Sequence, residues 1–254
     1  DSLKEGGGSH SGRSMRMAGY VMGKASEAVI GRARKIAAHV FGAPLDEIDF
    51  ADGIVSRRGT NRSASLFAIA RLARDRADLP DDLKGRLAAD HQHLFKEAGF
   101  PYGSHVCEVE IDPETGVSKV VRYTTVDDVG VAVNPMLVTG QVHGGVAQGI
   151  GQALCEQVVH DADSGQPLTG TFMDYAMPRA GMVRHVEMTM DESTPCRNNL
   201  LGVKGVGELG TIGATPTVVN AVVDALVRAG VPTARVEALQ MPLTPERVWR
   251  ALQP

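Results

Sequence analysis

The stretch Gly202-Val-Lys-Gly-Val-Gly-Glu-Leu-Gly-Thr-Ile-Gly-Ala-Thr-Pro216 holds five glycines and one acidic residue, Glu208. Glycines let a backbone turn tightly and approach a ligand closely. Because an apolar pattern of helical period follows from Thr217, the stretch predicts a loop that leads into a buried helix. A carboxylate in such a loop is expected to be poorly solvated, which makes it a better proton acceptor near neutral pH. Lys204 could hold a substrate or adjust the basicity of that carboxylate.

Two other interpretations of this loop stay open. The spacing Gly205-x-Gly207-x-x-Gly210 matches the fingerprint of dinucleotide-binding domains, and a helix follows it. Few residues remain after Gly210 to build the rest of such a domain, and a glutamate inside the loop would repel a pyrophosphate. The loop could also be a flexible turn that carries an acid by chance.

Bulk composition limits the class of protein. The chain has 254 residues, enough for one large or two modest domains, and its 43% hydrophobic and 22% charged residues are ordinary for a globular protein. The net charge of −4 without a basic stripe argues against a nucleic-acid partner. No apolar run is long enough to predict a membrane span.

The three cysteines are Cys107, Cys155 and Cys196, and they lie far apart in the sequence. An odd and sparse count indicates a reducing compartment, so we expect a cytoplasmic protein. Without clustered thiolates we expect no iron–sulfur cluster on this chain. The chain opens at Asp1 and runs directly into glycines, which suggests a fragment whose missing part completes an active site.

The segment Gly6-Gly-Gly-Ser-His-Ser-Gly-Arg-Ser14 precedes a helical pattern that ends at Gly42 and Pro44. Small residues expose backbone N–H groups, hydroxyls add donors, and Arg13 can bind an anion with two hydrogen bonds. A loop that leads into a helix start is a suitable anion site. The alternative is a disordered tail with an arginine in it by chance.

A second glycine-rich helix is expected after Asn134-Pro135. Gln141 and Gln148 are seven residues apart and share one face of it. Five glycines between Gly140 and Gly151 each cost about 1 kcal/mol against alanine in a helix, so something must approach this backbone closely. Tight helix packing with two glutamines at its rim and a polar ligand bound by the glutamine amides are both open.

The other patterns predict an α+β fold with helices packed on mixed β-sheets. We expect two sub-domains, a helix-plus-hairpin unit over residues 1–125 and a cofactor-binding unit over residues 126–254. His91 and His93 are expected at the surface, as are Glu108 and Glu110. The expected elements are hairpins over 48–57 and 104–126, strands over 183–190 and 235–239, a loop over 127–135 that leads into the glutamine helix, and helices over 63–77 and 244–252.

Three segments in this order resemble one family. They are Gly8-Ser-His-Ser-Gly-Arg-Ser14, Gly140-Gln-Val-His-Gly-Gly-Val-Ala-Gln-Gly-Ile-Gly151 and Val203-Lys-Gly-Val-Gly-Glu208. They resemble the C-terminal part of the molybdenum-binding subunit of the xanthine dehydrogenase, aldehyde oxidase and carbon monoxide dehydrogenase family. The resemblance covers almost the whole chain from Gly6 onward.

The resemblance implies an enzyme that oxidises an aldehyde or N-heterocyclic carbon, with water as the oxygen source. Glu208 would act as the general base, Lys204 would contact the substrate, and no residue of this chain would ligate the metal directly. The cofactor would be a molybdenum-pterin, either molybdopterin or its cytosine dinucleotide form. The residues expected to bind it are Ser9, His10, Ser11, Arg13, Gln141, Gly144, Gly145, Gln148 and Gly149.

One departure from the family pattern concerns the residues after the base. Many relatives carry Glu-Pro-Pro or Glu-Ser-Pro there, whereas this chain has Glu208-Leu-Gly, which favours the bacterial members. The resemblance also implies partners: a missing N-terminal portion or second molybdopterin-binding chain, subunits or domains with [2Fe–2S] clusters and FAD, and a small-molecule substrate. A non-catalytic interaction domain on the same scaffold, or a dinucleotide-binding module, remains the alternative.

Overall fold

The computed structural model describes residues 8–10, 12–183 and 185–254. The chain divides into two compact units, one made of residues 17–96 and the other of residues 1–16 with 97–254. The division expected from the sequence lay instead between residues 125 and 126. The difference concerns the hairpin of residues 102–128, which shares a core with the C-terminal helices because its residues Val120 and Tyr123 are buried among them.

The unit of residues 17–96 is built on most of helix α1 (Arg13–Phe41). A three-stranded antiparallel sheet follows, with strands β1 (Ile48–Ala51), β2 (Ile54–Arg57) and β3 (Ser63–Ser65). The predicted hairpin is confirmed, since Asp52 and Gly53 both have positive φ angles, 49° and 77°, as its tight turn requires. Helix α2 (Leu66–Asp75) begins with the Ser65 hydroxyl accepting a hydrogen bond from the Ala68 amide. Single turns of 3₁₀ helix lie at Leu45–Glu47 and Asp81–Leu83.

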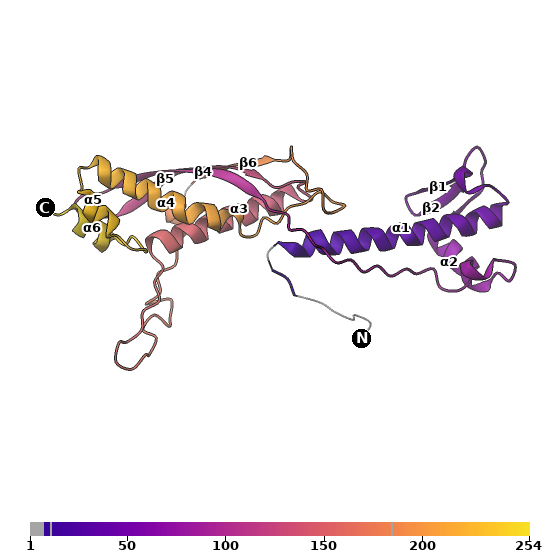
Figure 1. Ribbon diagram of the computed structural model, residues 1–254, viewed down its shortest axis with the longest axis horizontal. Helices are drawn as coiled ribbons and strands as arrows, with labels where there is room; N and C mark the ends of the chain where they lie inside the picture. The colour runs from indigo at the N-terminus through magenta and orange to yellow at the C-terminus, as the bar shows by residue number, and fades with distance from the viewer. Residues whose placement is uncertain (1–7, 11, 184) are drawn as a thin grey trace. The chain divides into compact units, whose positions relative to one another are not determined.

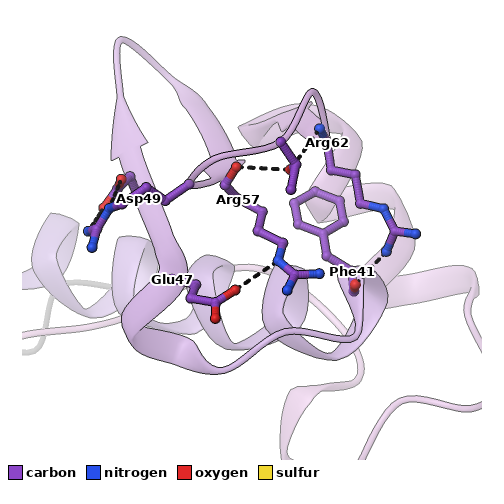
Figure 2. Close-up of polar contacts among 7 residues, drawn as sticks. Phe41, Glu47, Asp49, Arg57 and Arg62 are labelled. Atoms are coloured by element: carbon purple, nitrogen blue, oxygen red, sulfur yellow. Dashed lines mark hydrogen bonds and ion pairs between the residues drawn. The ribbon is translucent and has the colours of Figure 1, made fainter.

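Arginines stabilise the connections of this unit, as Figure 2 shows. The Arg62 guanidinium donates to the carbonyl oxygen of Phe41, the last residue of α1. Arg57 Nε lies 2.8 Å from Glu47 Oε2 and links β2 to the 3₁₀ turn before β1. Carbonyl groups at a helix end have no partner inside the helix, so the Arg62 contact satisfies one of them.

The other unit contains a mixed sheet, as predicted, that is covered by two helices (Figure 1). Strands β4 (Tyr102–Ile111) and β5 (Ser118–Asp128) form an antiparallel hairpin, and β6 (Val186–Asp191) pairs with β5 in parallel. Helices α3 (Pro135–Leu154) and α4 (Leu209–Arg228) lie side by side along it and supply most of the core. The remaining elements are a 3₁₀ turn at Ala180–Met182 and the helices α5 (Thr233–Glu237) and α6 (Pro245–Leu252).

Close backbone contact between α3 and α4 accounts for two of the glycines in α3. A Cβ atom at Gly145 would overlap the backbone of Gly210 and Thr211, and one at Gly149 would overlap Ala214. Gly144, in contrast, has open space around its Cβ position. The α3 glycines therefore serve helix packing at two positions, as the first of the two sequence interpretations requires.

Helix α4 begins earlier than the sequence pattern indicated. The apolar period starts at Thr217, but the helix starts at Leu209 and includes Gly210 and Gly213. These glycines are helical because their missing side chains leave room for α3 and for the ring of His105. Among the described residues, α4 is the one helix that is long and apolar enough to cross a membrane by length and composition. Its apolar side lies in the core beside α3.

Two local predictions were wrong. Residues 235–239, predicted as a strand, belong to or follow the single helical turn of α5, in which only Val236 is buried. A single buried residue satisfies a period of two as well as a single helical turn. Asp127 and Asp128, predicted in a loop, are the last residues of β5, and both are buried. The predicted surface positions of Glu108 and Glu110 on β4 are confirmed.

Candidate functional site

A cavity of about 650 Å³ lies within the unit of residues 1–16 and 97–254. Residues from three segments far apart in the sequence line it, namely Ser9, His10, Gly12, Ser14 and Met15, then residues within 131–141 and within 203–208. It brings together predicted site residues from all three family-like segments: Ser9, His10, Gln141, Lys204 and Glu208. The lining does not include Arg13, Gly144, Gly145, Gln148 or Gly149, and Ser11 lies outside the described residues.

The N-terminal loop is held in shape by its own polar groups. The Arg13 guanidinium donates two hydrogen bonds, of 3.1 and 2.8 Å, to the carbonyl oxygen of Gly8. The hydroxyls of Ser9 and Ser14 lie 2.5 Å apart. Arg13 thus holds the loop against the start of α1, and Ser9 and Ser14 line the cavity.

Two glycines allow this loop to touch the loop that carries Glu208. Gly12 has a φ of 60°, a value that favours glycine, and a Cβ there would overlap the backbone of Gly205. A Cβ on Gly205 would in turn overlap Gly12. The close contact of the two backbones forms one wall of the cavity, which explains why both segments are rich in glycine.

Gln141 of α3 also lines the cavity, close to the loop of Glu208. It lies exposed on α3, and its Oε1 atom would be 3.6 Å from a Cβ built on Gly207. Gln148 is also exposed, about two turns further along the helix, but it lies outside the cavity lining. Of the two predicted glutamines, the structure therefore brings Gln141 alone to the loop of Glu208.

The loop of Glu208 is anchored at its upstream end by Asn199, a buried side chain. Asn199 Nδ2 donates to the Val203 carbonyl at 3.0 Å, and Asn199 Oδ1 accepts from the Val203 amide at 3.2 Å. Val203 also forms an isolated antiparallel bridge with Gly130, just after β5. The glycine motif at 205–210 thus follows an isolated bridge, and no parallel β-strand leads into it among the described residues. A dinucleotide fingerprint needs such a strand before its glycines, so the structure does not support that interpretation of the motif.

Glu208 occupies the N-cap position of α4, where its carbonyl oxygen accepts from the Ile212 amide at 3.1 Å. It lines the cavity and faces the same space as Gln141. The residue is exposed in the described chain, whereas the sequence interpretation expected a poorly solvated carboxylate. Exposure leaves this carboxylate free to meet a molecule placed in the cavity.

Lys204 forms an ion pair with Asp128, which the sequence did not predict. Its Nζ lies 2.7 Å from Asp128 Oδ2, 3.4 Å from Thr194 Oγ1 and 4.7 Å from the centre of the Tyr102 ring. Burial by itself raises the pKa of Asp128, but hydrogen bonds from Lys204, Thr194 and the Gly130 amide lower that pKa to about 2. The neighbouring residues Asp127 and Asp128 could have indicated this partner in the sequence. They were predicted in a loop, where a carboxylate is normally solvated, so their burial at the end of a strand was not expected.

A second buried polar cluster lies between the sheet and α4. The His105 ring contacts the Tyr123 hydroxyl at 2.7 Å and Asp127 Oδ1 at 3.0 Å, and Thr125 donates to Asp127 Oδ2 at 2.7 Å. Burial raises the pKa of the Tyr123 hydroxyl above its usual range. Gly213 leaves the space that the His105 ring fills, so this cluster fixes where the first turns of α4 lie.

The cavity suits a polar ring system with a phosphate tail. Its volume lies within the range of small-molecule sites, roughly 300–1,000 Å³. Its lining combines apolar side chains such as Val133 and Leu137 with an amide, hydroxyls and glycine-rich backbone. These groups supply both donors and acceptors, so the residues present fit a pterin that carries a phosphate.

A family model described as the molybdopterin cofactor-binding domain matches residues 1–184. The chain is 36% identical over 255 residues to the 6-hydroxypseudooxynicotine dehydrogenase complex subunit gamma of Paenarthrobacter nicotinovorans, with coverage of 99% of this chain and 31% of the relative. It is 35% identical to the carbon monoxide dehydrogenase large chain of Hydrogenophaga pseudoflava, with coverage of 97% and 30%.

Solved structures agree with the fold. The copper- and molybdenum-containing carbon monoxide dehydrogenase matches with a TM-score of 0.84, 28% identity and coverage of 98% of this chain and 30% of that chain. Quinoline 2-oxidoreductase of Pseudomonas putida 86 matches with a TM-score of 0.79, 32% identity and coverage of 99% and 31%. The chain spans about a third of the length of these relatives. The α+β fold expected from the sequence is confirmed, and the chain belongs to the family of molybdopterin cofactor-binding domains found in molybdenum-dependent enzymes of the xanthine dehydrogenase type.

Proposed function

We propose that this chain forms part of a molybdenum hydroxylase and that Glu208 is its general base. The observation that carries the proposal is the cavity, in which the Glu208 loop, Gln141 and the Ser9–His10 segment meet. These groups come from the three segments that resemble the family, and they share one space large enough for a cofactor and a small substrate.

The polar groups of the cavity divide between holding the cofactor and serving the reaction. The Gln141 amide and the backbone near Gly12 and Gly205 would bind the pterin, and Ser9 and His10 would bind its phosphate end. Arg13 would act indirectly, because its guanidinium holds the loop through the Gly8 carbonyl. Gly145 and Gly149 would contribute by letting α4 approach α3, which sets the position of Glu208.

The molybdenum centre, when bound, supplies a two-electron oxidant and a Lewis acid. Glu208 would accept the proton that has to leave a water molecule before its oxygen attacks an electron-poor carbon. The carboxylate lines the cavity, and its residue is the N-cap of α4, so the start of the helix holds the Glu208 backbone in place. A base held in this way loses little freedom at the moment of proton transfer.

The substrate class follows from the relatives. Their names include nicotine 6-hydroxylase large subunit and quinoline 2-oxidoreductase, which favours an N-heterocyclic carbon, and an aldehyde oxidoreductase subunit, which favours an aldehyde. A complex subunit gamma and a large chain among them support the presence of partner subunits. We propose that those partners carry [2Fe–2S] clusters and FAD. We place the complex in the cytoplasm, and either form of the pterin, with or without a cytosine nucleotide, is part of the proposal.

Metal and cofactor analysis of the complete purified protein tests this proposal. We expect about one molybdenum per chain, together with a pterin released on denaturation. Bound NAD in place of molybdenum would show a dinucleotide-binding module instead. Absence of both from protein made in molybdenum-replete cells would point to an interaction domain that kept only the scaffold.

A further inference from the structure

A buried ion pair ties the loop of Glu208 to the sheet. Lys204 and Asp128 lie 2.7 Å apart, and their side chains are only 8% and 1% exposed. Removing one partner of such a pair leaves an uncompensated buried charge, whereas replacing both partners by neutral residues is often tolerated. The pair therefore joins the two segments more firmly than a surface salt bridge would.

In the described part of the chain, the contacts of both charged groups come from the sheet and from the segments that follow β5 and β6. Asp128 also accepts hydrogen bonds from the Thr194 hydroxyl and, at 2.9 Å, from the Gly130 amide. The Lys204 ammonium lies over the Tyr102 ring on β4. These contacts direct the ammonium toward β4, β5 and the segment after β6, so it is not free to bind a substrate in the cavity.

The loop has a second anchor beyond Glu208. Gly210 lies against α3, where a Cβ would overlap the carbonyl oxygen of Val142. Upstream, the Lys204 amide donates to the Val129 carbonyl at 3.1 Å. Only residues 205–209 connect these two fixed points. The Lys204 anchor acts beside the Asn199 bonds to Val203 and the contact of Gly205 with Gly12, and together they hold the backbone that carries Glu208.

We propose that Asp128 is a positioning residue for Glu208, and that Lys204 anchors the loop instead of contacting the substrate. This inference rests on the proposed role of Glu208 as the base. It replaces the expectation that Lys204 binds the substrate. The two roles can be distinguished by experiment, since they affect different kinetic constants. An anchor that orients a base changes kcat, whereas a substrate ligand lost from the ground state changes KM.

Four variants of the complete, cofactor-loaded enzyme test the anchor: Asp128→Asn, Lys204→Met, the double variant, and Lys204→Arg. We expect each of the first two to lower kcat about 10- to 100-fold, since a small displacement of a catalytic group has effects of that size. KM should stay within about twofold, as expected when uniform substrate binding is intact. The double variant should be no slower than either single variant, because the two side chains act as one unit.

Lys204→Arg should restore most of the turnover, because a guanidinium can still bond the Asp128 carboxylate. Amide hydrogen exchange supplies a readout that does not depend on turnover. We expect the amides of residues 203–208 to exchange about tenfold faster in Asp128→Asn than in the parent enzyme, as a loop released from its anchor would. Arg122→Met is the matched control, because it removes an exposed ion pair with Glu187 between β5 and β6 and should change neither readout.

A raised KM with unchanged kcat in Lys204→Met, together with unchanged exchange in Asp128→Asn, would overturn the proposal and return Lys204 to the substrate. If Asp128→Asn fails to fold, the double variant carries the test, since it leaves no unpaired charge. Failure of the proposed function is separate. It would appear as full turnover in Glu208→Gln, and the exchange measurement would still decide whether Asp128 anchors the loop.

Discussion

Gly145 on α3 and Gly210 on α4 face each other so closely that a Cβ atom on either would overlap the backbone of the other. The contact lies one helical turn from the cavity residue Gln141 and two residues from Glu208. The spacing of α3 and α4 at this point therefore sets the distance between two walls of the cavity.

Gly145→Ala should destabilise the protein. The added methyl group has to displace helix backbone, and overpacking of this kind lowers the free energy of unfolding by about 1–3 kcal/mol. Thermal unfolding of the complete protein measures the effect. Gly144→Ala is the matched control, because its Cβ position is open and alanine raises helix stability by up to about 1 kcal/mol. Equal stability of the two variants would contradict the packing role of Gly145.

Glu208→Gln should keep the molybdenum content and lose turnover. The amide fills the same space in the cavity but accepts no proton, and loss of a general base lowers the rate about 10²- to 10⁴-fold. Steady-state kinetics normalised to molybdenum content measure the effect. Glu246→Gln on α6, which removes an exposed pair with Arg250, should leave turnover unchanged. Turnover of Glu208→Gln equal to that of the parent would rule out the assigned role.

Arg13→Ala should lower cofactor occupancy. Without the two hydrogen bonds to the Gly8 carbonyl, the loop that carries Ser9 and His10 loses its fixed shape. Ordering the loop then costs part of the free energy of cofactor binding. Molybdenum per chain is the measurement, and we expect it to fall several-fold. Arg228→Ala, which removes an exposed pair with Asp224 on α4, is the control. Full occupancy in Arg13→Ala would show that this arginine has no part in the site.

The stability that Asp128 contributes should disappear in acid. Its pKa is lowered from 3.8 to about 2 in the folded protein, so the contribution is present above pH 4 and is lost as the pH falls through 2. The shift corresponds to about 2 kcal/mol, so the gap in unfolding free energy between the parent and Asp128→Asn should narrow by that amount. Denaturant unfolding at a series of pH values measures this gap.

A control for the acid prediction is Asp81→Asn, which removes an exposed pair with Lys84. Exposed pairs contribute little, so the difference in unfolding free energy between the parent and this variant should stay small and nearly constant across the same pH series. A gap between the parent and Asp128→Asn that stays constant down to pH 2 would show that the Asp128 carboxylate is not stabilised in its charged form.

Local sequence patterns were sufficient for most elements of the fold. The hairpin around Asp52-Gly53, the helix after Pro135 and the cap at Thr244 all follow from residue types that act within a few positions of each other. The single turn of α5 was missed because one buried residue, Val236, carries no period. The early start of α4 was missed because the glycines before Thr217 are helical only in contact with α3 and the His105 ring.

The sequence by itself determined the family and the three segments that meet in the cavity, because short contiguous motifs are enough to recognise the family and to locate the segments. It also indicated that something approaches the α3 backbone closely. Only the tertiary structure decided that Gly145 meets α4 while Gly144 stays open, and that Lys204 is paired with Asp128. Such contacts join residues far apart in the chain. They depend on strand pairing and helix spacing, which no local pattern of residues encodes.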